Sequence, residues 1–335
     1  MNNISDNESL DTSFYEFGST TLDTYFSYTL LILICGGAPI VLFILICSIH
    51  FSILQNSKLA PLLYHYFILS ITAGDLIFLA LYAVPLVIKH RFQIALDQNA
   101  LFCRINILSS HLGTVASSTS LLCLNIDKFV AIVRPLHYTS LVTRRRARMA
   151  ILACWGIAFM WTILFTFGPL THFDDRCLIT VSKRAYIVFS TVFFITPILV
   201  AGALSYTIAV VAFKAIVKRG KFKLADDTVS QKSSNGRANV GRLGFVFTTT
   251  LWSCLSCVPY RVWYIINGTT STEGNYAQQV LLVCFFTLMI AHPVGNALIT
   301  LLTQRRYRRL TVAVASAVKC QWRAIELVSD RRRET

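Results

Sequence analysis

An acid and a base, Asp127 and Lys128, stand next to each other at the end of a long apolar stretch of the chain. A charge at the centre of a membrane helix costs about 3 kcal/mol to insert, so it usually marks a functional site or a specific partner. An ammonium beside a carboxylate forms a charge-assisted pair that can rearrange when its surroundings change. Phe129 follows the pair, and the corner Pro135-Leu136 closes the segment. We interpret this segment as a conformational switch.

Two further ionisable residues, Asp75 and Arg261, lie inside apolar runs. Asp75 is either part of a functional polar network or a structural acid that is hydrogen-bonded to its neighbours. Arg261 lies two residues after Pro259 and has two possible orientations. Facing inward, it could pair with an anionic ligand through two parallel hydrogen bonds. Facing outward, it would extend along the helix to the lipid headgroups.

No residue pattern in the chain suits catalysis or metal binding. Four of the seven histidines, His90, His111, His172 and His292, lack the spacing of a zinc site. We find no Ser-His-Asp set, no glycine-rich phosphate loop and no pair of catalytic carboxylates. We therefore expect a protein that is not an enzyme and that needs no cofactor and no metal ion.

The elements that must position these residues are membrane helices. Of the 335 residues, 55% are hydrophobic and only 14% are charged, whereas about a quarter of the residues in a soluble domain are charged. Helices satisfy their own backbone in lipid, and about 20 apolar residues span the hydrocarbon core. Seven runs are long enough, at 28–50, 62–88, 101–133, 149–169, 185–213, 243–267 and 277–302. We predict an all-α membrane protein, a seven-transmembrane helix bundle.

The distribution of charge predicts the orientation of the bundle. Residues 1–27 carry five acids and no Lys or Arg, whereas basic residues gather in 134–148, 214–242 and 303–335. Basic segments remain on the cytoplasmic side, where anionic lipid attracts them. We expect an extracellular tail over 1–27, a receptor domain over 28–302 in the plasma membrane, and a cytoplasmic remainder. Because the basic residues lie between apolar spans, we expect no nucleic-acid partner.

Beyond the seventh run, basic and apolar residues mix from Gln304 to Leu310 and continue through Val312 and Val314. This pattern suits a short amphipathic eighth helix that lies on the inner leaflet and contacts membrane lipid.

Two kinds of residue on the expected outer side could be modified. The sequons at Asn3, Asn7 and Asn267 are either glycosylation sites or chance matches. Cys103 and Cys177 lie at outer boundaries, where an oxidising environment permits a disulfide, and we expect them to pair.

From about Leu30 to Leu310 the chain resembles the rhodopsin-like G protein-coupled receptors. The resemblance rests on several markers in the right order and spacing rather than on any single one. Asp75 resembles the second-helix acid of a sodium and polar-network site, and Asp127-Lys128-Phe129 resembles the Asp-Arg-Tyr switch. The other markers are the Cys103–Cys177 disulfide, Trp155 in the fourth span, Pro197 in the fifth and Pro259 in the sixth.

The seventh span departs from the family pattern. Residues 292–296 could be a degraded Asn-Pro-x-x-Tyr motif, but the better register begins at Asn296. In that register the proline has become Ala297 and the tyrosine has become Thr300, and we expect Asn296 and Thr300 to join the polar network of Asp75. Pro293, one turn earlier, could supply the kink instead.

Other departures concern the switch itself. Lys128 replaces the family arginine, so the planar fork that can bond two groups at once is lost. Cys257 stands where the family usually has a tryptophan, and the first span contains no Asn to face Asp75. These departures affect sodium binding and coupling strength, but not the expected fold.

The resemblance implies a receptor for an extracellular ligand, with a heterotrimeric G protein as its inner partner. The seventh span has no lysine to hold retinal, and Ser110 replaces the acid of amine receptors. The segment from Pro135 to Ala147 resembles odorant receptors, so we expect a small-molecule or odorant-like ligand. A non-signalling scavenger or heterodimer partner is the alternative, and a transporter is a weaker one because no inverted repeat is visible. The expected pocket residues are Ser110, His111, Thr114, Arg261, Tyr264 and Phe286, and the expected coupling residues are Asp127, Lys128, Phe129, Pro135 and Leu136.

Overall fold

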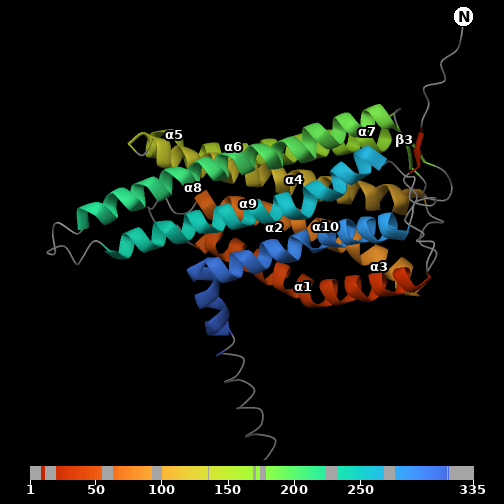
Figure 1. Cartoon of the computed structure of the whole chain (residues 1–335), viewed down its shortest axis with the longest axis horizontal. Helices are drawn as coiled ribbons and strands as arrows, with labels where there is room; N and C mark the ends of the chain where they lie inside the picture. Colours follow the sequence, from red (N-terminus) through yellow and green to blue (C-terminus); the bar gives the residue numbers. More distant parts are fainter. Residues whose placement is uncertain are drawn as a thin grey trace, which may run out of the picture.

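The computed structural model is a bundle of long helices (Figure 1). It describes residues 9–11, 20–54, 63–92, 100–134, 136–168, 171–173, 179–223, 233–267, 276–314 and 316. Within these residues the helices make seven spans, which confirms the predicted fold. The elements are α1 (Thr20–Leu54), α2 (Leu63–Phe78), α3 (Val84–Phe92), α4 (Ala100–Val133), α5 (Tyr138–Leu141), α6 (Arg144–Phe167), α7 (Lys183–Ser190), α8 (Thr196–Lys223), α9 (Ser233–Asn267) and α10 (Tyr276–Thr303).

The apolar runs locate the spans but do not give the helix ends. α1 begins at Thr20, eight residues before the predicted run, and α8 continues to Lys223. Hydrophobicity reports where a helix crosses lipid, whereas backbone hydrogen bonding continues into the polar turns beyond. Of the described helices, six are long and apolar enough to cross a membrane. The exception, α9, is rich in Ser, Thr, Trp and Tyr and still packs between α8 and α10.

Two of the seven spans contain a π-helical turn just before a proline. In the second span, η2 (Leu79–Ala83) joins α2 to α3, and in the fifth span η4 (Thr191–Ile195) joins α7 to α8. Pro85 and Pro197 lack an N–H, so a carbonyl one turn earlier loses its helical partner, and a π turn absorbs the mismatch. These turns were not predicted from the hydrophobic pattern.

The freed carbonyl in the second span has found another donor. Leu81 O lies four residues before Pro85, and Asn106 Nδ2 on α4 donates to it at 2.7 Å. Asn106 is 1% exposed, so this bond is shielded from solvent. An amide side chain from a neighbouring helix thus replaces the missing backbone donor.

α4 occupies the centre of the bundle and contacts α2, α6, α8 and α9. Its contact with α2 is close because glycines face each other. A Cβ placed on Gly74 would lie 2.8 Å from Gly113 O, and one placed on Gly113 would lie 2.6 Å from Gly74 O. Small residues let helix backbones approach in this way. The approach positions Asp75 opposite the side chains of α4.

A small antiparallel sheet covers one end of the bundle, which we call the sheet end (Figure 1). Its strands are β1 (Ser9–Asp11), β3 (Ile179–Ser182) and β2 (Thr171–Phe173), in the order β1-β3-β2. Leu10 is paired with Val181, so the N-terminal segment joins the loop between the fourth and fifth spans. The all-α prediction lacks this sheet, because strands of three and four residues leave no alternating pattern.

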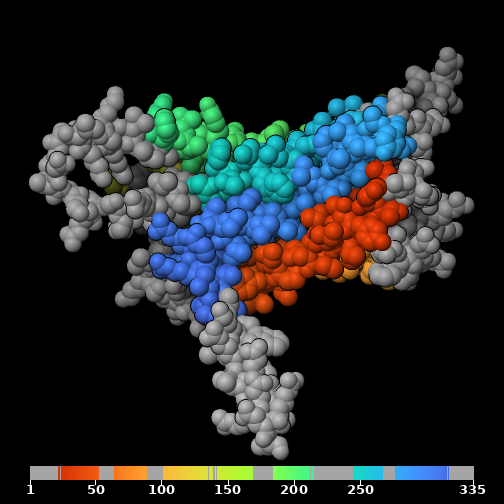
Figure 2. Space-filling view, turned by 60° about the horizontal axis from the view of Figure 1, so that its bottom comes forward, coloured from red at the N-terminus to blue at the C-terminus, as the bar shows by residue number. Residues whose placement is uncertain are grey.

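The chain turns sharply after α10 into a short helix over residues 305–314. Figure 2 shows this segment beside the end of α1, on the face where α1 and α10 run together. Tyr307 is fully buried there, while Val312 is 64% exposed, so the helix has one packed and one open face. This agrees with the predicted amphipathic eighth helix.

Candidate functional site

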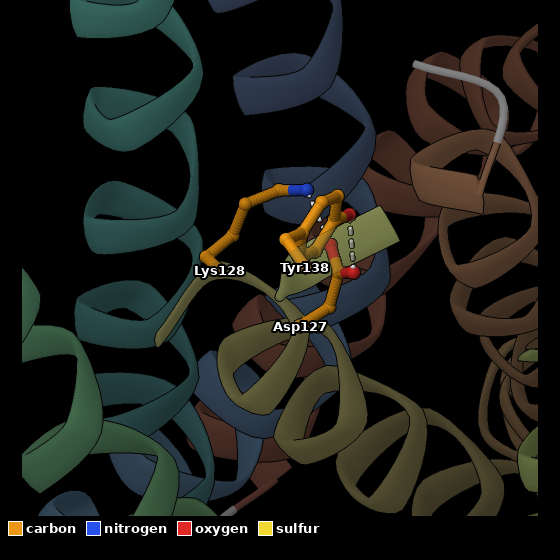
Figure 3. A network of polar contacts seen from close by, with 3 residues as sticks. All are labelled: Asp127, Lys128 and Tyr138. Carbon is orange, nitrogen blue, oxygen red and sulfur yellow. Dashed lines mark hydrogen bonds and ion pairs between the residues drawn. The ribbon is translucent and has the colours of Figure 1, made fainter. Parts of the chain in front are cut away.

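The predicted switch lies at the end of α4 that is opposite to the sheet end. Asp127 is buried, and one of its carboxylate oxygens forms an ion pair with the Lys128 ammonium. The other oxygen accepts a hydrogen bond of 2.8 Å from the Tyr138 hydroxyl. Figure 3 shows Lys128 and Tyr138 converging on this carboxylate. Since Tyr138 belongs to α5, the bond joins the end of α4 to the corner that follows it.

The Lys128 ammonium has a second contact, with an aromatic ring of α2. Its Nζ lies 5.1 Å from the centre of the Tyr64 ring, within the range of a cation–π interaction. The lysine therefore connects α4 with α2 in addition to pairing with Asp127. An ammonium is a compact charge, so it does so without the paired parallel hydrogen bonds of an arginine.

The corner after α4 is an exposed surface next to the switch. Leu136 is 90% exposed and Val133 is 50% exposed. Together with Arg134 and His137 they line a shallow depression. Phe129 is partly buried beside them, whereas Pro135 lies outside the described residues. An exposed apolar residue with basic neighbours suits contact with a partner protein.

Asp75 lies in the middle of the bundle and is almost fully buried. Its Oδ1 accepts a hydrogen bond of 2.8 Å from the Ser117 hydroxyl, and its Oδ2 accepts one of 3.0 Å from Asn296 Nδ2. The acid thus joins α2 to α4 and α10. Thr300, predicted for the same network, instead donates to Asn296 O at 2.8 Å and lines the cavity beside the acid.

The network continues from Asn296 into α9. Asn296 Nδ2 lies 3.0 Å from His292 Nε2, and His292 Nδ1 lies 2.8 Å from Ser256 Oγ. Ser256 in turn donates to Trp252 O at 2.7 Å. These bonds are all satisfied when His292 is neutral and carries its proton on Nδ1. A chain of hydrogen bonds thus runs from Asp75 to the backbone of α9.

Hydrogen bonds from two neighbouring helices reach both oxygens of Asp75. Ser117 donates to one oxygen, and the amide NH₂ of Asn296 donates to the other. Within the described residues, no group of three or more His, Cys, Asp or Glu could hold a metal ion. We therefore describe the Asp75 region as a hydrogen-bond network.

A cavity lies on the sheet-end side of this network, where Cys257 replaces the family tryptophan. It is lined by side chains of the second, third, sixth and seventh spans. A thiol fills much less volume than an indole, so the replacement accounts for the space. The lining residues are Asp75, Phe78, Gly113, Thr114, Cys257, Met289, His292 and Pro293.

α9 carries a tryptophan, Trp252, farther from the sheet end than Cys257. Its Nε1 donates to His292 O at 3.0 Å, and its ring lies against Gly295 of α10. The absence of a side chain at Gly295 makes room for the ring. Trp252 and Gly295 therefore form the main aromatic contact between α9 and α10 near the network.

Arg261 points into the bundle, in the half nearer the sheet end. It is 6% exposed, so it does not extend outward to lipid headgroups. Its guanidinium carbon lies 4.1 Å from the centre of the Phe194 ring, and Nη1 donates to the Tyr186 hydroxyl at 3.3 Å. Of the two orientations open from the sequence, the structure has the inward one.

The other predicted pocket residues fall into two groups. His111, Tyr264 and Phe286 are buried and lie in the ring cluster around Arg261. Ser110 and Thr114 bond instead to the backbone of their own helix, at 2.8 and 2.7 Å. The structure thus brings the aromatic members together and turns the hydroxyl groups of Ser110 and Thr114 back on α4.

The predicted modification sites are only partly described. Cys103 is buried near the start of α4 and is disulfide-bonded. Cys177, its expected partner, lies outside the described residues, as do Asn3 and Asn7. Asn267 is the last residue of α9. The disulfide pairing and the glycosylation sites remain predictions.

Residues 44–299 match the family model described as 7 transmembrane receptor (rhodopsin family), which is more than half of the chain. The chain belongs to the rhodopsin-like G protein-coupled receptors. It is therefore a multi-pass membrane receptor, and its relatives are receptors rather than enzymes.

The receptor is similar to several curated proteins. It is 34% identical over 199 residues to the G-protein coupled receptor aex-2 of Caenorhabditis elegans, covering 58% of this chain and 57% of that one. It is 26% identical over 227 residues to the GQ-coupled rhodopsin of Mizuhopecten yessoensis, covering 63% and 44%. It is 23% identical over 273 residues to the melanopsin of Podarcis siculus, covering 76% and 55%. The chain thus spans about half the length of these relatives.

The receptor has functional contacts that the sequence did not reveal. Ser117, His292 and Ser256 belong to the Asp75 network, and Tyr186 and Phe194 surround Arg261. His292 could have been predicted to join the network. It is a polar residue four positions before Asn296, and residues four apart lie on the same face of a helix. Tyr186 and Phe194 gave no such signal, since aromatic residues are common in every span.

Proposed function

We propose that this receptor carries a small-molecule signal from outside the cell to a heterotrimeric G protein. In this proposal it lies in the plasma membrane, with the tail over 1–27 and the sheet end outside, and with residues 303–335 inside. The positions of the basic segments support this orientation, because basic segments face the cytoplasm. The Cys103–Cys177 disulfide and glycosylation at Asn3 and Asn7 fit the same orientation.

The observation that carries the proposal is the closed cluster of Asp127, Lys128 and Tyr138 beside the exposed corner at Leu136. A buried ion pair that also bonds to the neighbouring loop has two distinct arrangements, paired and separated. A ligand that favours one helix arrangement shifts the population between them. Opening would release Lys128 beside the exposed corner at Leu136, so that the ammonium and the corner, with Pro135, could contact the G protein together.

The hydrogen-bond network gives a path for this coupling. Asp75 and Asn296 join the second, third and seventh spans, and Ser256 extends the connection to α9. A ligand in the sheet-end half that moves α9 would change these bonds before it changes the switch. The network lies in the middle of the bundle, between the sheet end and the switch.

The residues of α4 and α10 do not fit two ligand classes. Some relatives are named rhodopsin and melanopsin, but α10 contains no lysine that could form a Schiff base with retinal. Ser110 offers a hydroxyl rather than the carboxylate that an ammonium ligand would need. A small-molecule or odorant-like ligand without an essential amine remains the proposal.

The test measures G protein activation in cells that express the receptor at matched surface levels. Asp127→Asn removes the charge that holds Lys128 and Tyr138, so we expect higher basal activation. Lys128→Arg restores a bidentate donor, so we expect stronger coupling to the same G protein. Silence of the wild type and of both variants across a panel of Gα subunits would favour the non-signalling alternative.

A further inference from the structure

Arg261 is a buried cation without an anionic partner among the described residues. The described part of the chain contains one ion pair, between Lys128 and Asp127, and it lies at the other end of the bundle. Arg261 has a single described hydrogen-bond acceptor, the neutral Tyr186 hydroxyl. A guanidinium has five N–H donors, so most of its hydrogen-bonding capacity is unused.

The contacts that remain compensate the charge only in part. The guanidinium lies over Phe194, which the π turn η4 places in the interior, and it lies 5.7 Å from the centre of the Tyr260 ring. Cation–π contacts stabilise a buried cation by less than its burial costs. The structure holds a charge there that the described residues do not neutralise.

Two more polar groups next to Arg261 are also unpaired. Tyr264 OH and His111 Nδ1 are buried, and neither has a hydrogen-bond partner among the described residues. Both lie close enough to interact with the charge of Arg261. A buried polar group without a hydrogen-bond partner destabilises the folded protein. Two unpaired groups beside one unneutralised cation indicate a place for a ligand that accepts hydrogen bonds.

The surroundings describe the rest of that ligand. The rings of Phe165 and Phe189 stack at 4.3 Å, and His111 lies edge-on to both at 5.0 and 5.4 Å. Phe194 completes the cluster at 5.5 Å from Phe189. Such rings favour an aromatic or other flat apolar body.

We propose that the receptor binds a small aromatic carboxylic acid through Arg261. The carboxylate accepts two parallel hydrogen bonds from the guanidinium and a third from Tyr264, and the aromatic body packs against the cluster of Phe165, Phe189 and Phe194. The inference rests on the proposed receptor function, because it names the class of ligand that would bind beside Arg261. Because Arg261 supplies one positive charge, we expect a ligand with one carboxylate.

The experiment measures binding to the purified full-length receptor in detergent, by its thermal denaturation. The probes are phenylacetate, 3-phenylpropionate and 4-phenylbutyrate, each compared with its uncharged amide at equal concentration and ionic strength. We expect at least one acid to raise the melting temperature while its amide does not. The proposal is overturned if no acid raises it, or if acid and amide act equally.

Variants then test the contact itself. Arg261→Gln should weaken binding of the acid about 100-fold, and Tyr264→Phe about 10-fold. Arg261→Lys keeps the charge without the fork and should weaken it about 10-fold, so it decides the matter if Arg261→Gln does not fold. Arg184→Gln, at an exposed basic residue near the same end, is the matched control and should bind like the wild type. Unchanged affinity in both Arg261 variants contradicts the proposal.

This measurement is independent of signalling. If the acid binds through Arg261 but no G protein is activated, the ligand site is supported and the proposed signalling function is rejected. If a G protein is activated but no acid binds, the signalling function is supported and the ligand site is rejected.

Discussion

The indole N–H of Trp252 donates to the backbone carbonyl of His292 at 3.0 Å and so joins α9 to α10. The same His292 bonds through its ring to Ser256 and Asn296. One residue of α10 therefore connects a tryptophan on α9 with the buried acid Asp75. In a receptor that has Cys257 in place of the usual tryptophan, Trp252 is an aromatic side chain of α9 that contacts α10 beside the network.

The first prediction concerns the Trp252 hydrogen bond. Trp252→Phe keeps a ring against Gly295 but removes the N–H, so we expect a loss of about 1 kcal/mol in stability and a higher basal G protein activation. Thermal denaturation and nucleotide exchange on Gα measure the two effects. Trp161→Phe, on the exposed side of α6, is the control and should change neither. Lower basal activity in Trp252→Phe would show that this bond does not hold the inactive arrangement.

The second prediction concerns the space at Gly295. A methyl group there would overlap the Trp252 indole, so Gly295→Ala should destabilise the receptor by about 1–3 kcal/mol. Gly156→Ala is the matched control, because a Cβ at that position meets nothing within 4 Å. In a helix interior that change should be neutral or stabilising by up to about 1 kcal/mol. Equal melting temperatures for the two variants would refute the packing argument.

The third prediction tests how the proline of the second span is accommodated. Asn106→Ala leaves Leu81 O without its side-chain donor and should cost about 1–3 kcal/mol. Pro85→Ala returns a backbone N–H close to that carbonyl, so the double variant should recover part of the loss. A double-mutant cycle on the melting temperatures gives the coupling between the two positions. Strictly additive effects would mean that Asn106 does not substitute for the missing donor.

The fourth prediction concerns the helix after α10. Tyr307 is fully buried, and its hydroxyl lies 2.9 Å from Ser48 Oγ and 3.2 Å from His65 Nδ1. Tyr307→Phe should cost about 1 kcal/mol, whereas Tyr307→Ala should cost about 3–5 kcal/mol because it leaves a cavity. Ser48→Ala in the Tyr307→Phe background should add little, since the shared bond is already gone. A full additional loss would place the contribution of Ser48 elsewhere.

Burial also makes this contact sensitive to alkaline pH. It raises the pKa of the Tyr307 phenol above its ordinary value, so the folded receptor retains that proton when the unfolded chain has lost it. The stabilising contribution is complete below the ordinary tyrosine pKa of about 10 and declines as the pH rises above it. The stability difference between the wild type and Tyr307→Phe should shrink over that range.

Several features of the fold and the site were predictable because a strong local cost reveals them. A carboxylate at Asp75 and an ion pair at Asp127 and Lys128 are conspicuous in apolar runs, since charge is expensive there. The seven spans follow from the same principle, because lipid demands long apolar segments. Their ends do not, since helices continue past the hydrocarbon wherever the backbone can still pair.

Other features depend on contacts between distant parts of the chain. Ser117 could have bonded to its own helix, as Ser110 does, and only the approach of α2 turns it to Asp75. The orientation of Arg261 was open because both lipid and pocket lay within reach of its side chain. The π turn at η4 places Phe194 beneath it, and such a turn leaves no hydrophobic pattern in the sequence.

The contact between Gly74 and Gly113 has a consequence for motion. Each backbone carbonyl stands where the other glycine would carry a side chain, so the backbones of α2 and α4 are in direct contact at this point. We expect the two helices to move together and to keep the bond between Ser117 and Asp75 while the receptor changes state. We expect the activating displacement between this pair and α9 or α10. Distance probes across α2 and α4 should then remain still while probes across α4 and α9 report the transition.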